Sequence, residues 1–144
     1  MHLQSKLKVD YTLEEVTTFF FEPSSLPKWD RSVAQMIPTS DPVAGKGATF
    51  DTISPSGMRM SYEVTEIHAD RVKIKLVNSK MFKWAVWQFQ FEPVGKETEV
   101  ICSVDVRLRK LYAFLYPVLY FNRSALLRDL SFFRDALEKY YKDR

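Results

Sequence analysis

Residues 58–76, MRMSYEVTEIHADRVKIKL, decide the fold. Apolar side chains occupy every second position on either side of a short polar break at residues 68–70, and this period of two predicts a pair of half-buried strands. A short turn between two such strands favours antiparallel pairing. One face of the pair is expected to form core, namely Met58, Met60, Tyr62, Val64, Val72, Ile74 and Leu76.

Two further alternating runs extend this hairpin toward the C-terminus. Residues 83–92 and 99–107 are separated by a break at residues 93–96, which contains a proline and a glycine. Hairpin therefore follows hairpin, and we predict a curved antiparallel sheet of about six or seven strands. The apolar positions of the two runs are Ala85, Trp87, Phe89, Phe91, Val100, Cys102, Val104 and Val106.

The N-terminal part of the chain predicts one strand and two short helices. Residues 1–10 alternate between polar and apolar side chains, as a half-buried strand does. Thr12 and Glu15 have the spacing of a capping box, in which each side chain binds a backbone N–H of the first helical turn. Pro23 ends this helix, and the serine and proline that follow favour one more helical turn just before Trp29.

The C-terminal part changes to the period of an amphipathic helix. Pro117 lacks a backbone N–H, so we expect a kink or a helix start there. The apolar stripe is interrupted by Asn122 and Arg123, which are expected either to lie at a polar end of a cavity or to point outward. These elements together predict an α+β fold in which the sheet wraps around a long C-terminal helix. The stripe itself is Leu126, Leu130, Phe133, Leu137 and Tyr140.

The composition favours a single domain over residues 1–144, with no linker or internal repeat. Aromatic residues make up 15% of the chain, which supplies large apolar side chains to its interior. The net charge of +3 comes from basic residues spread from Lys6 to Arg144. Nucleic acid is therefore not expected as a partner, because binding to phosphates requires a concentrated basic surface.

The cysteine content and the hydropathy of the chain predict a cytoplasmic location. Cys102 is the only cysteine, which fits a reducing compartment, and the N-terminus lacks the apolar run of a secretory signal. The uncharged, aromatic-rich stretch at residues 111–121 is far shorter than a membrane span. It leaves open a lid, a transient membrane contact or a dimer contact, so the chain is expected to be a monomer or a homodimer.

The sequence offers no convincing catalytic, metal or cofactor residues. His2 lies at the terminus, His68 lies in a predicted turn, and Cys102 has the apolar parity of its strand, which favours an inert core thiol. Nothing in the sequence pairs Asp30 or Asp51 with a second catalytic group. We therefore predict no catalytic residue, no metal site and no cofactor.

Several segments, in this order and spacing, resemble the START and birch-pollen-allergen superfamily, also called SRPBCC, and are most similar to its polyketide cyclase/dehydrase-like branch. The resemblance covers nearly the whole chain. It implies a helix-grip fold with a cavity between the sheet and the long helix that takes lipids, polyketides, quinones or similar apolar molecules. The segments that carry it are residues 9–16, 26–29, 45–50, 60–66 and 126–137.

Three functions are consistent with the sequence and the implied cavity. The leading hypothesis is that the chain binds a small hydrophobic molecule without catalysis. The second is an enzyme of cyclase or dehydratase type, in which Tyr62, Asp51 or Arg123 polarises a carbonyl group. The third is an interaction module like the chaperone-activating members of the superfamily, using rings near Tyr116. The expected cavity residues are Trp29, Phe50, Met58, Met60, Tyr62, Trp87, Phe89, Val104, Leu115, Leu119, Asn122, Arg123 and Leu126.

Overall fold

A computed structural model describes residues 1–40 and 45–143 of the chain. Seven strands form one antiparallel sheet in the order β1-β7-β6-β5-β4-β3-β2, and the number of strands agrees with the prediction. The strands are β1 (His2–Val9), β2 (Gln35–Pro38), β3 (Thr49–Ile53), β4 (Arg59–His68), β5 (Arg71–Val77), β6 (Phe82–Val94) and β7 (Glu97–Leu108).

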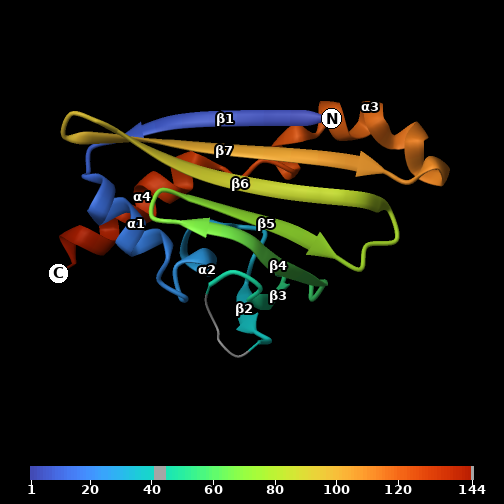
Figure 1. Cartoon of the computed structure of the whole chain (residues 1–144), viewed down its shortest axis with the longest axis horizontal. Helices are drawn as coiled ribbons and strands as arrows, with labels where there is room; N and C mark the ends of the chain where they lie inside the picture. Colours follow the sequence, from blue (N-terminus) through green and yellow to red (C-terminus); the bar gives the residue numbers. More distant parts are fainter. Residues whose placement is uncertain (41–44, 144) are drawn as a thin grey trace.

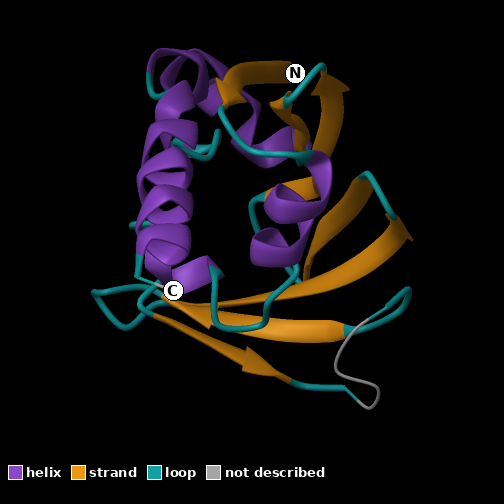
Figure 2. Cartoon of the chain, turned by 90° about the vertical axis from the view of Figure 1, so that its left-hand side faces the viewer, coloured by secondary structure: helices purple, strands orange, loops and turns teal. Residues whose placement is uncertain are grey.

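The helices lie on one side of this sheet. They are α1 (Leu13–Phe20), α2 (Leu26–Trp29), α3 (Tyr116–Phe121) and α4 (Leu130–Lys142), with two 3₁₀ helices, η1 (Lys110–Leu115) and η2 (Arg123–Ala125). Figure 1 shows α4 and α1 near one end of the molecule and α3 near the other. Figure 2 shows the strands bending around the helices. The expected α+β architecture, a curved antiparallel sheet around a C-terminal helix, is confirmed.

The two short helices after β1 begin as the sequence predicts, but through different interactions. Thr12 and Glu15 form the capping box: the Thr12 N–H donates to Glu15 Oε1 at 3.0 Å, and the Glu15 N–H donates to Thr12 Oγ1 at 3.2 Å. Ser25 precedes α2 without capping it, because its hydroxyl donates to the Phe20 carbonyl at 3.0 Å. That bond ties α2 to the end of α1.

Two irregularities in strand pairing decide which side chains face the helices. The pairing of β4 with β5 shifts between Val64 and Glu66, and the pairing of β6 with β7 shifts between Phe82 and Trp84. A bulge changes the side-chain parity of a strand. In β6, Phe82 is buried before the bulge, and the odd-numbered residues from Ala85 onward are buried after it. Trp84 is exposed on the outer face.

The C-terminal helix is shorter than the sequence predicts. It begins at Leu130, where Asp129 caps it by accepting a hydrogen bond from the Ser131 N–H at 2.9 Å. Leu126, which was expected to lie on this helix, precedes it in a turn. Pro117 lies at the start of a separate helix, α3. Of the kink and the helix start expected at this residue, the structure shows the helix start. Of the predicted stripe, Leu126 thus lies in the turn between α3 and α4, and the other four residues lie on α4.

Aromatic rings fill much of the space between α1, α4 and the sheet. Phe133 of α4 is 1% exposed, and its ring centre lies 5.6 Å from that of Phe19 and 5.3 Å from that of Trp29. Phe20 lies 4.9 Å from both Phe89 and Phe91. Rings at such distances attract one another beyond the burial of their area, so this cluster fixes α4 against the sheet.

Replacing Phe133 with alanine tests this anchoring of α4. We expect the free energy of unfolding to fall by about 3–5 kcal/mol, because a buried ring is lost and a void remains. Urea denaturation followed by far-UV circular dichroism measures the change. The control is Asp135→Ala on the exposed side of the same helix, which should change stability by less than about 0.5 kcal/mol. Equal losses in the two variants would contradict the role of Phe133.

Candidate functional site

Two adjoining hollows lie between the sheet and α2. The larger has a volume of about 140 Å³ and the smaller of about 40 Å³. Both are lined mainly by apolar and aromatic side chains from α1, α2 and the inner face of the sheet. We call them together the inner cavity. The residues shared by the two linings are Phe20, Leu26, Trp29, Phe50 and Ile74.

Trp29 gives the inner cavity a polar group that has no partner. Its side chain is 3% exposed and lines both hollows. Within the described part of the chain, its buried indole Nε1 atom has no hydrogen-bond partner. A buried donor without a partner is costly, so native proteins generally satisfy such groups with a side chain, a water molecule or a ligand. Trp29, which lines the inner cavity, thus carries an unpartnered hydrogen-bond donor.

Trp87, in contrast, already uses its indole N–H. This group donates to the carbonyl oxygen of Leu126 at 2.8 Å, so the sheet holds the turn that precedes α4. In this conformation the Trp87 indole N–H is therefore not free to orient a ligand. Its ring still lines the smaller hollow, and the ring of Tyr62 packs against it with 5.8 Å between ring centres.

Arg128, which lines the smaller hollow, belongs to a largely buried ion pair. Arg128 Nη1 lies 2.8 Å from Asp30 Oδ2, with 14% and 7% of the two side chains exposed. Arg128 also donates to Ser32 Oγ at 2.9 Å, and Asp30 accepts from the N–H and the hydroxyl of Ser32. The guanidinium group lies over the ring of Trp87, 5.3 Å from its centre. Arg128 is thus held by a carboxylate, a hydroxyl and a ring.

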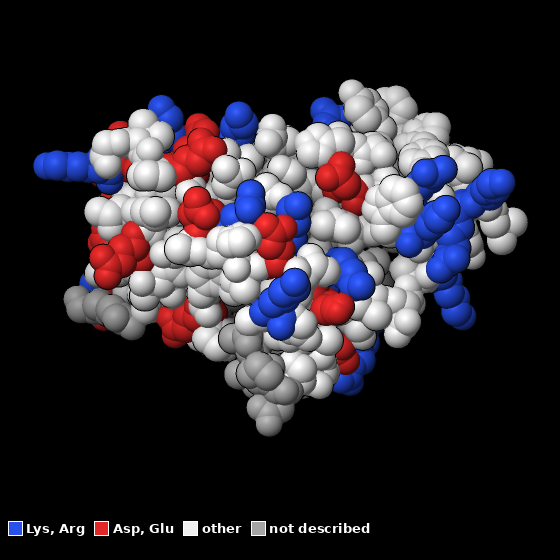
Figure 3. Space-filling model, viewed as in Figure 1, with Lys and Arg blue, Asp and Glu red and all other residues white. Residues whose placement is uncertain are grey.

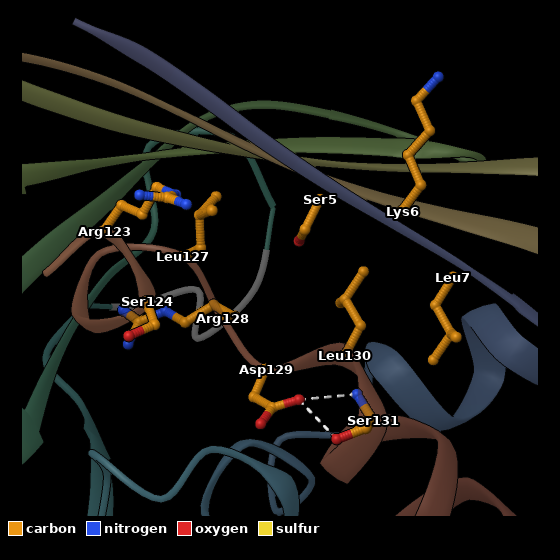
Figure 4. A pocket seen from close by; sticks show the side chains of 10 residues that line it. All are labelled: Ser5, Lys6, Leu7, Arg123, Ser124, Leu127, Arg128, Asp129, Leu130 and Ser131. Atoms are coloured by element: carbon orange, nitrogen blue, oxygen red, sulfur yellow. Dashed lines mark hydrogen bonds between the residues drawn. The ribbon is translucent and has the colours of Figure 1, made fainter. Parts of the chain in front are cut away.

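A third hollow, of about 380 Å³, lies outside this ion pair between β1 and the start of α4 (Figure 4). Ser5 and Leu7 of β1 point toward it, and Arg123 and Arg128 approach it from the other side. Its walls are more polar than those of the inner cavity. Asp129 in its floor is already bound to the N–H and the hydroxyl of Ser131. These walls suit an apolar ligand less well than the inner cavity does.

The structure brings five of the expected cavity residues to the inner cavity and places three others at the surface. Met58 is 63% exposed because β4 begins one residue later, and its N–H donates to Ser54 Oγ in the turn. Asn122 and Arg123 are exposed at the end of α3, where their side chains donate to backbone carbonyls. The residues that line the inner cavity as expected are Trp29, Phe50, Tyr62, Trp87 and Phe89.

The other expected cavity residues do not line the two hollows. Val104 is fully buried in β7. Met60 is half-buried, and its sulfur accepts a weak hydrogen bond from the Tyr62 hydroxyl at 3.8 Å. Leu115, Leu119 and Leu126 are half-buried and pack against the core.

Sequence reasoning missed the residues that complete the inner cavity. Phe20 and Leu26 come from the short helices, which the prediction treated only as connections. Arg128 was missed because the C-terminal helix was expected to be continuous from Leu126. A signal was present: Asp129 before the apolar period of α4 is a typical helix N-cap, which makes Arg128 a turn residue that is able to point inward.

The candidate acid or base Asp51 lies on the sheet face opposite the inner cavity. Its neighbours Phe50 and Thr52 are buried on the inner face, and alternate residues of a strand face opposite sides. Arg59 Nε lies 2.6 Å from Asp51 Oδ2, and hydrogen bonds from Arg59 and Ser61 lower the pKa of this carboxyl group. Asp51 is therefore placed away from the ligand-sized space.

Cys102 is an inert core thiol, as expected. It is 0% exposed, and burial raises the pKa of the thiol to about 11, so little thiolate forms near neutral pH. Over residues 1–40 and 45–143, no group of three or more His, Cys, Asp and Glu side chains is placed to hold a metal ion. In the same residues, no helix is long and apolar enough to cross a membrane.

Solved structures match nearly the whole chain. Norcoclaurine synthase from Thalictrum flavum, in complex with dopamine and hydroxybenzaldehyde, is 14% identical with a TM-score of 0.72, covering 100% of this chain and 87% of that one. A START superfamily protein from Mycobacterium smegmatis is 14% identical with a TM-score of 0.67, covering 99% and 97%. The protein XoxI from Bacillus cereus is 14% identical with a TM-score of 0.68, covering 99% and 96%.

These matches cover the seven-stranded sheet and the C-terminal helix described above. The chain has the helix-grip fold. The fold implied by the resemblance to the START and birch-pollen-allergen superfamily is thereby confirmed. No protein-family model and no curated protein matches the sequence. At the identities found, the helix-grip likeness says nothing further about activity.

The buried ion pair of the inner cavity yields a prediction about stability. Arg128→Met should lower the free energy of unfolding by about 3–5 kcal/mol, because it leaves the Asp30 carboxylate buried without its partner. Adding Asp30→Asn should recover part of this loss, with a coupling above about 1 kcal/mol in a double-mutant cycle measured by urea denaturation. The matched control Arg123→Met removes an exposed guanidinium and should cost less than about 0.5 kcal/mol. A loss in Arg128→Met no larger than in the control would contradict the importance of the pair.

Proposed function

We propose that the chain binds a small, mainly apolar molecule with one hydrogen-bond acceptor in the inner cavity. The unpartnered indole N–H of Trp29, buried among aromatic walls, is the observation that carries this proposal. Ligand pockets are typically lined by hydrophobic and aromatic groups with a few polar groups that fix orientation. A carbonyl or ether oxygen on the ligand would satisfy the Trp29 donor, whereas a pure hydrocarbon would not.

The volume of the inner cavity limits the ligand in this conformation. An apolar cavity of about 150 Å³ is able to hold a molecule the size of benzene, and the larger hollow here is of that size. A long lipid chain would require the side chains between the two hollows to move. Of the ligand classes implied by the sequence resemblance, a compact ring system such as a quinone or a small polyketide-like aromatic fits this volume best.

The larger hollow also provides a route for the ligand. Its lining includes the exposed side chains of Phe21, Pro23 and Pro38, so it reaches the surface between α1, α2 and β2. Apolar residues at this rim favour entry of an apolar molecule from solution or from another surface. Inside, the ligand would meet Trp29 and the rings of the sheet.

Catalysis on a bound molecule is the second candidate function, and Tyr62 is the observation that favours it. Among the described residues, the Tyr62 hydroxyl makes only a weak hydrogen bond, to the Met60 sulfur at 3.8 Å. Tyr62 lines the smaller hollow together with Arg128. A hydroxyl and a guanidinium group at one end of a pocket are able to stabilise charge on a carbonyl oxygen. Norcoclaurine synthase, which has the same fold, is an enzyme solved with an aromatic aldehyde and an amine.

The catalytic alternative is tested by incubating the protein with 4-hydroxybenzaldehyde and dopamine, or with a small aromatic polyketide mimic, and analysing the mixture by mass spectrometry. Product formed by the wild-type chain and lost in Tyr62→Phe would support an enzyme of synthase or cyclase type. Recovery of unchanged molecules, with binding intact, would favour a binding protein.

The binding proposal predicts a preference for an acceptor group that depends on Trp29. Acetophenone should bind about tenfold more tightly than α-methylstyrene, which has the same shape but no oxygen, because only acetophenone accepts from the indole N–H. Titration followed by ¹⁵N-edited NMR measures this directly. The chain has three tryptophans, and the indole signal of Trp29 should move while those of exposed Trp84 and hydrogen-bonded Trp87 move less.

Two variants control this titration. Trp29→Phe keeps an aromatic wall and should remove the preference for acetophenone while retaining weak binding of both molecules. Ala48→Met adds a side chain inside the larger hollow and should abolish binding of both. A saturating probe that leaves the Trp29 signal unchanged, or an equal preference in Trp29→Phe, would refute the proposal.

A further inference from the structure

We propose that the end of the molecule formed by η1 and α3 docks on the surface of an anionic lipid bilayer. This docking surface consists of the outward-facing apolar residues of the 111–121 segment and the cations around them. The proposal uses a part of the molecule separate from the inner cavity and does not depend on what the cavity binds. The exposure of these residues, the charge around them and the hydrogen bonds that hold the segment support it.

The segment 111–121 is apolar on both of its faces and contains no charged residue. Its inner side packs against the core through the half-buried residues Tyr112, Leu115, Tyr116 and Leu119. Its outer side remains in water, where Phe114 and Phe121 are 72% and 80% exposed. A helix that is hydrophobic all round is normally buried in a protein core or in a membrane. The outer residues are Leu111, Phe114, Val118, Tyr120 and Phe121.

Hydrogen bonds hold the segment against the sheet, so its exposed side chains form a defined surface. The Tyr116 hydroxyl accepts a hydrogen bond from the Leu108 N–H at 3.0 Å, and the Arg109 N–H donates to the Met81 carbonyl at 3.0 Å. These bonds join the segment to the end of β7 and to the turn between β5 and β6. A rigid apolar surface needs no ordering before it binds, which favours association.

Positive charge surrounds this apolar surface. No acidic residue occurs in residues 71–91 or 106–128, and the nearest acid in the sequence, Asp105, is paired with His2 at 2.7 Å. Figure 3 shows blue side chains gathered at the end of the molecule that carries α3, with red side chains lying farther along the molecule. The exposed cations at this end are Lys80, Lys83, Arg107, Arg109, Lys110 and Arg123.

Trp84 extends the surface onto the sheet. It is exposed on the outer face of β6, and the guanidinium group of Arg107 lies over its ring, 5.3 Å from the ring centre. Arg123 lies in the same way over Tyr120, at 5.1 Å. Tryptophan and tyrosine with nearby cations are typical of the headgroup level of a membrane, where a ring and a charge are both accommodated.

This combination fits an anionic bilayer better than other occupants. A symmetric dimer across the same surface would bring its six cations against six identical ones, which is unfavourable. Single-stranded nucleic acid would use the cations and the rings, but Leu111 and Val118 offer no ring on which a base stacks. An anionic membrane surface uses all of these groups, because apolar tips enter the acyl boundary while the cations meet lipid phosphates.

Vesicle flotation of the purified full chain tests the proposal. Vesicles of phosphatidylcholine mixed with phosphatidylserine should carry the protein, and vesicles of phosphatidylcholine alone should carry much less. Raising the salt from about 0.1 M to about 0.5 M should weaken binding to the mixed vesicles, because it screens the cations. A chain that fails to float with the mixed vesicles at low salt would overturn the proposal.

Two pairs of variants separate the apolar and the charged contributions. Phe114→Ser with Phe121→Ser should reduce vesicle binding at least about tenfold, whereas Met58→Ser with Val94→Ser removes exposed apolar groups elsewhere and should leave it unchanged. Lys83→Glu with Lys110→Glu should reduce binding by more than about fivefold per site. The matched control Lys96→Glu with Lys142→Glu makes the same charge change away from the docking surface.

The outcomes distinguish this surface from its rivals. Equal losses in a test pair and its control would show general electrostatic or apolar adsorption and would overturn the proposal. Binding to a single-stranded oligonucleotide with no binding to vesicles, or a dimer that Phe114→Ser with Phe121→Ser dissociates in place of vesicle binding, would overturn it as well. All eight substituted side chains are exposed, so thermal melting should confirm that each variant remains folded.

Discussion

The segment immediately before α4 carries the interactions on which the rest of the structure depends. Trp87 of the sheet holds the Leu126 carbonyl at 2.8 Å, and two residues later Arg128 reaches Asp30 beside α2, also at 2.8 Å. The sheet, the short N-terminal helices and the C-terminal helix are thereby joined at one place. The hydrogen bond from Trp87 and the ion pair to Asp30 hold the turn before α4, and Phe133 of α4 packs against Phe19.

A buried ion pair is weak evidence for stability, because removing two charges from water costs about as much as their attraction returns. The ion pair between Asp30 and Arg128 matters here because of where it lies, next to the turn before α4. An apolar pair in place of Asp30 and Arg128 would fill space but would not select one arrangement of the turn before α4. Arg128 of this pair also lines both the inner cavity and the more open, polar hollow beside β1.

Local patterns predicted the local structure well. The alternation in residues 58–76 and 83–106 gave the strands and their inner faces, and the Thr12 and Glu15 pair gave the start of α1. The errors occur where tertiary contacts override a period: Met58 lies in the turn before β4, and α4 begins at Leu130 instead of Leu126. Arg128 belongs to this second group, because its partner is distant in sequence and no period marks a buried ion pair.

The contrast between Trp29 and Trp87 bears on whether the aromatic interior is only a core. Both are nearly buried, and both contribute large rings to the same cluster. The buried indole N–H of Trp87 donates to a backbone carbonyl and so anchors a turn. This hydrogen bond is a structural reason for a tryptophan at position 87. Trp29 has no such bond in the described structure, and phenylalanine would pack there without a stranded donor. The proposed ligand would supply the missing acceptor, which gives a reason for keeping a polar group at that cost beside space for a small molecule.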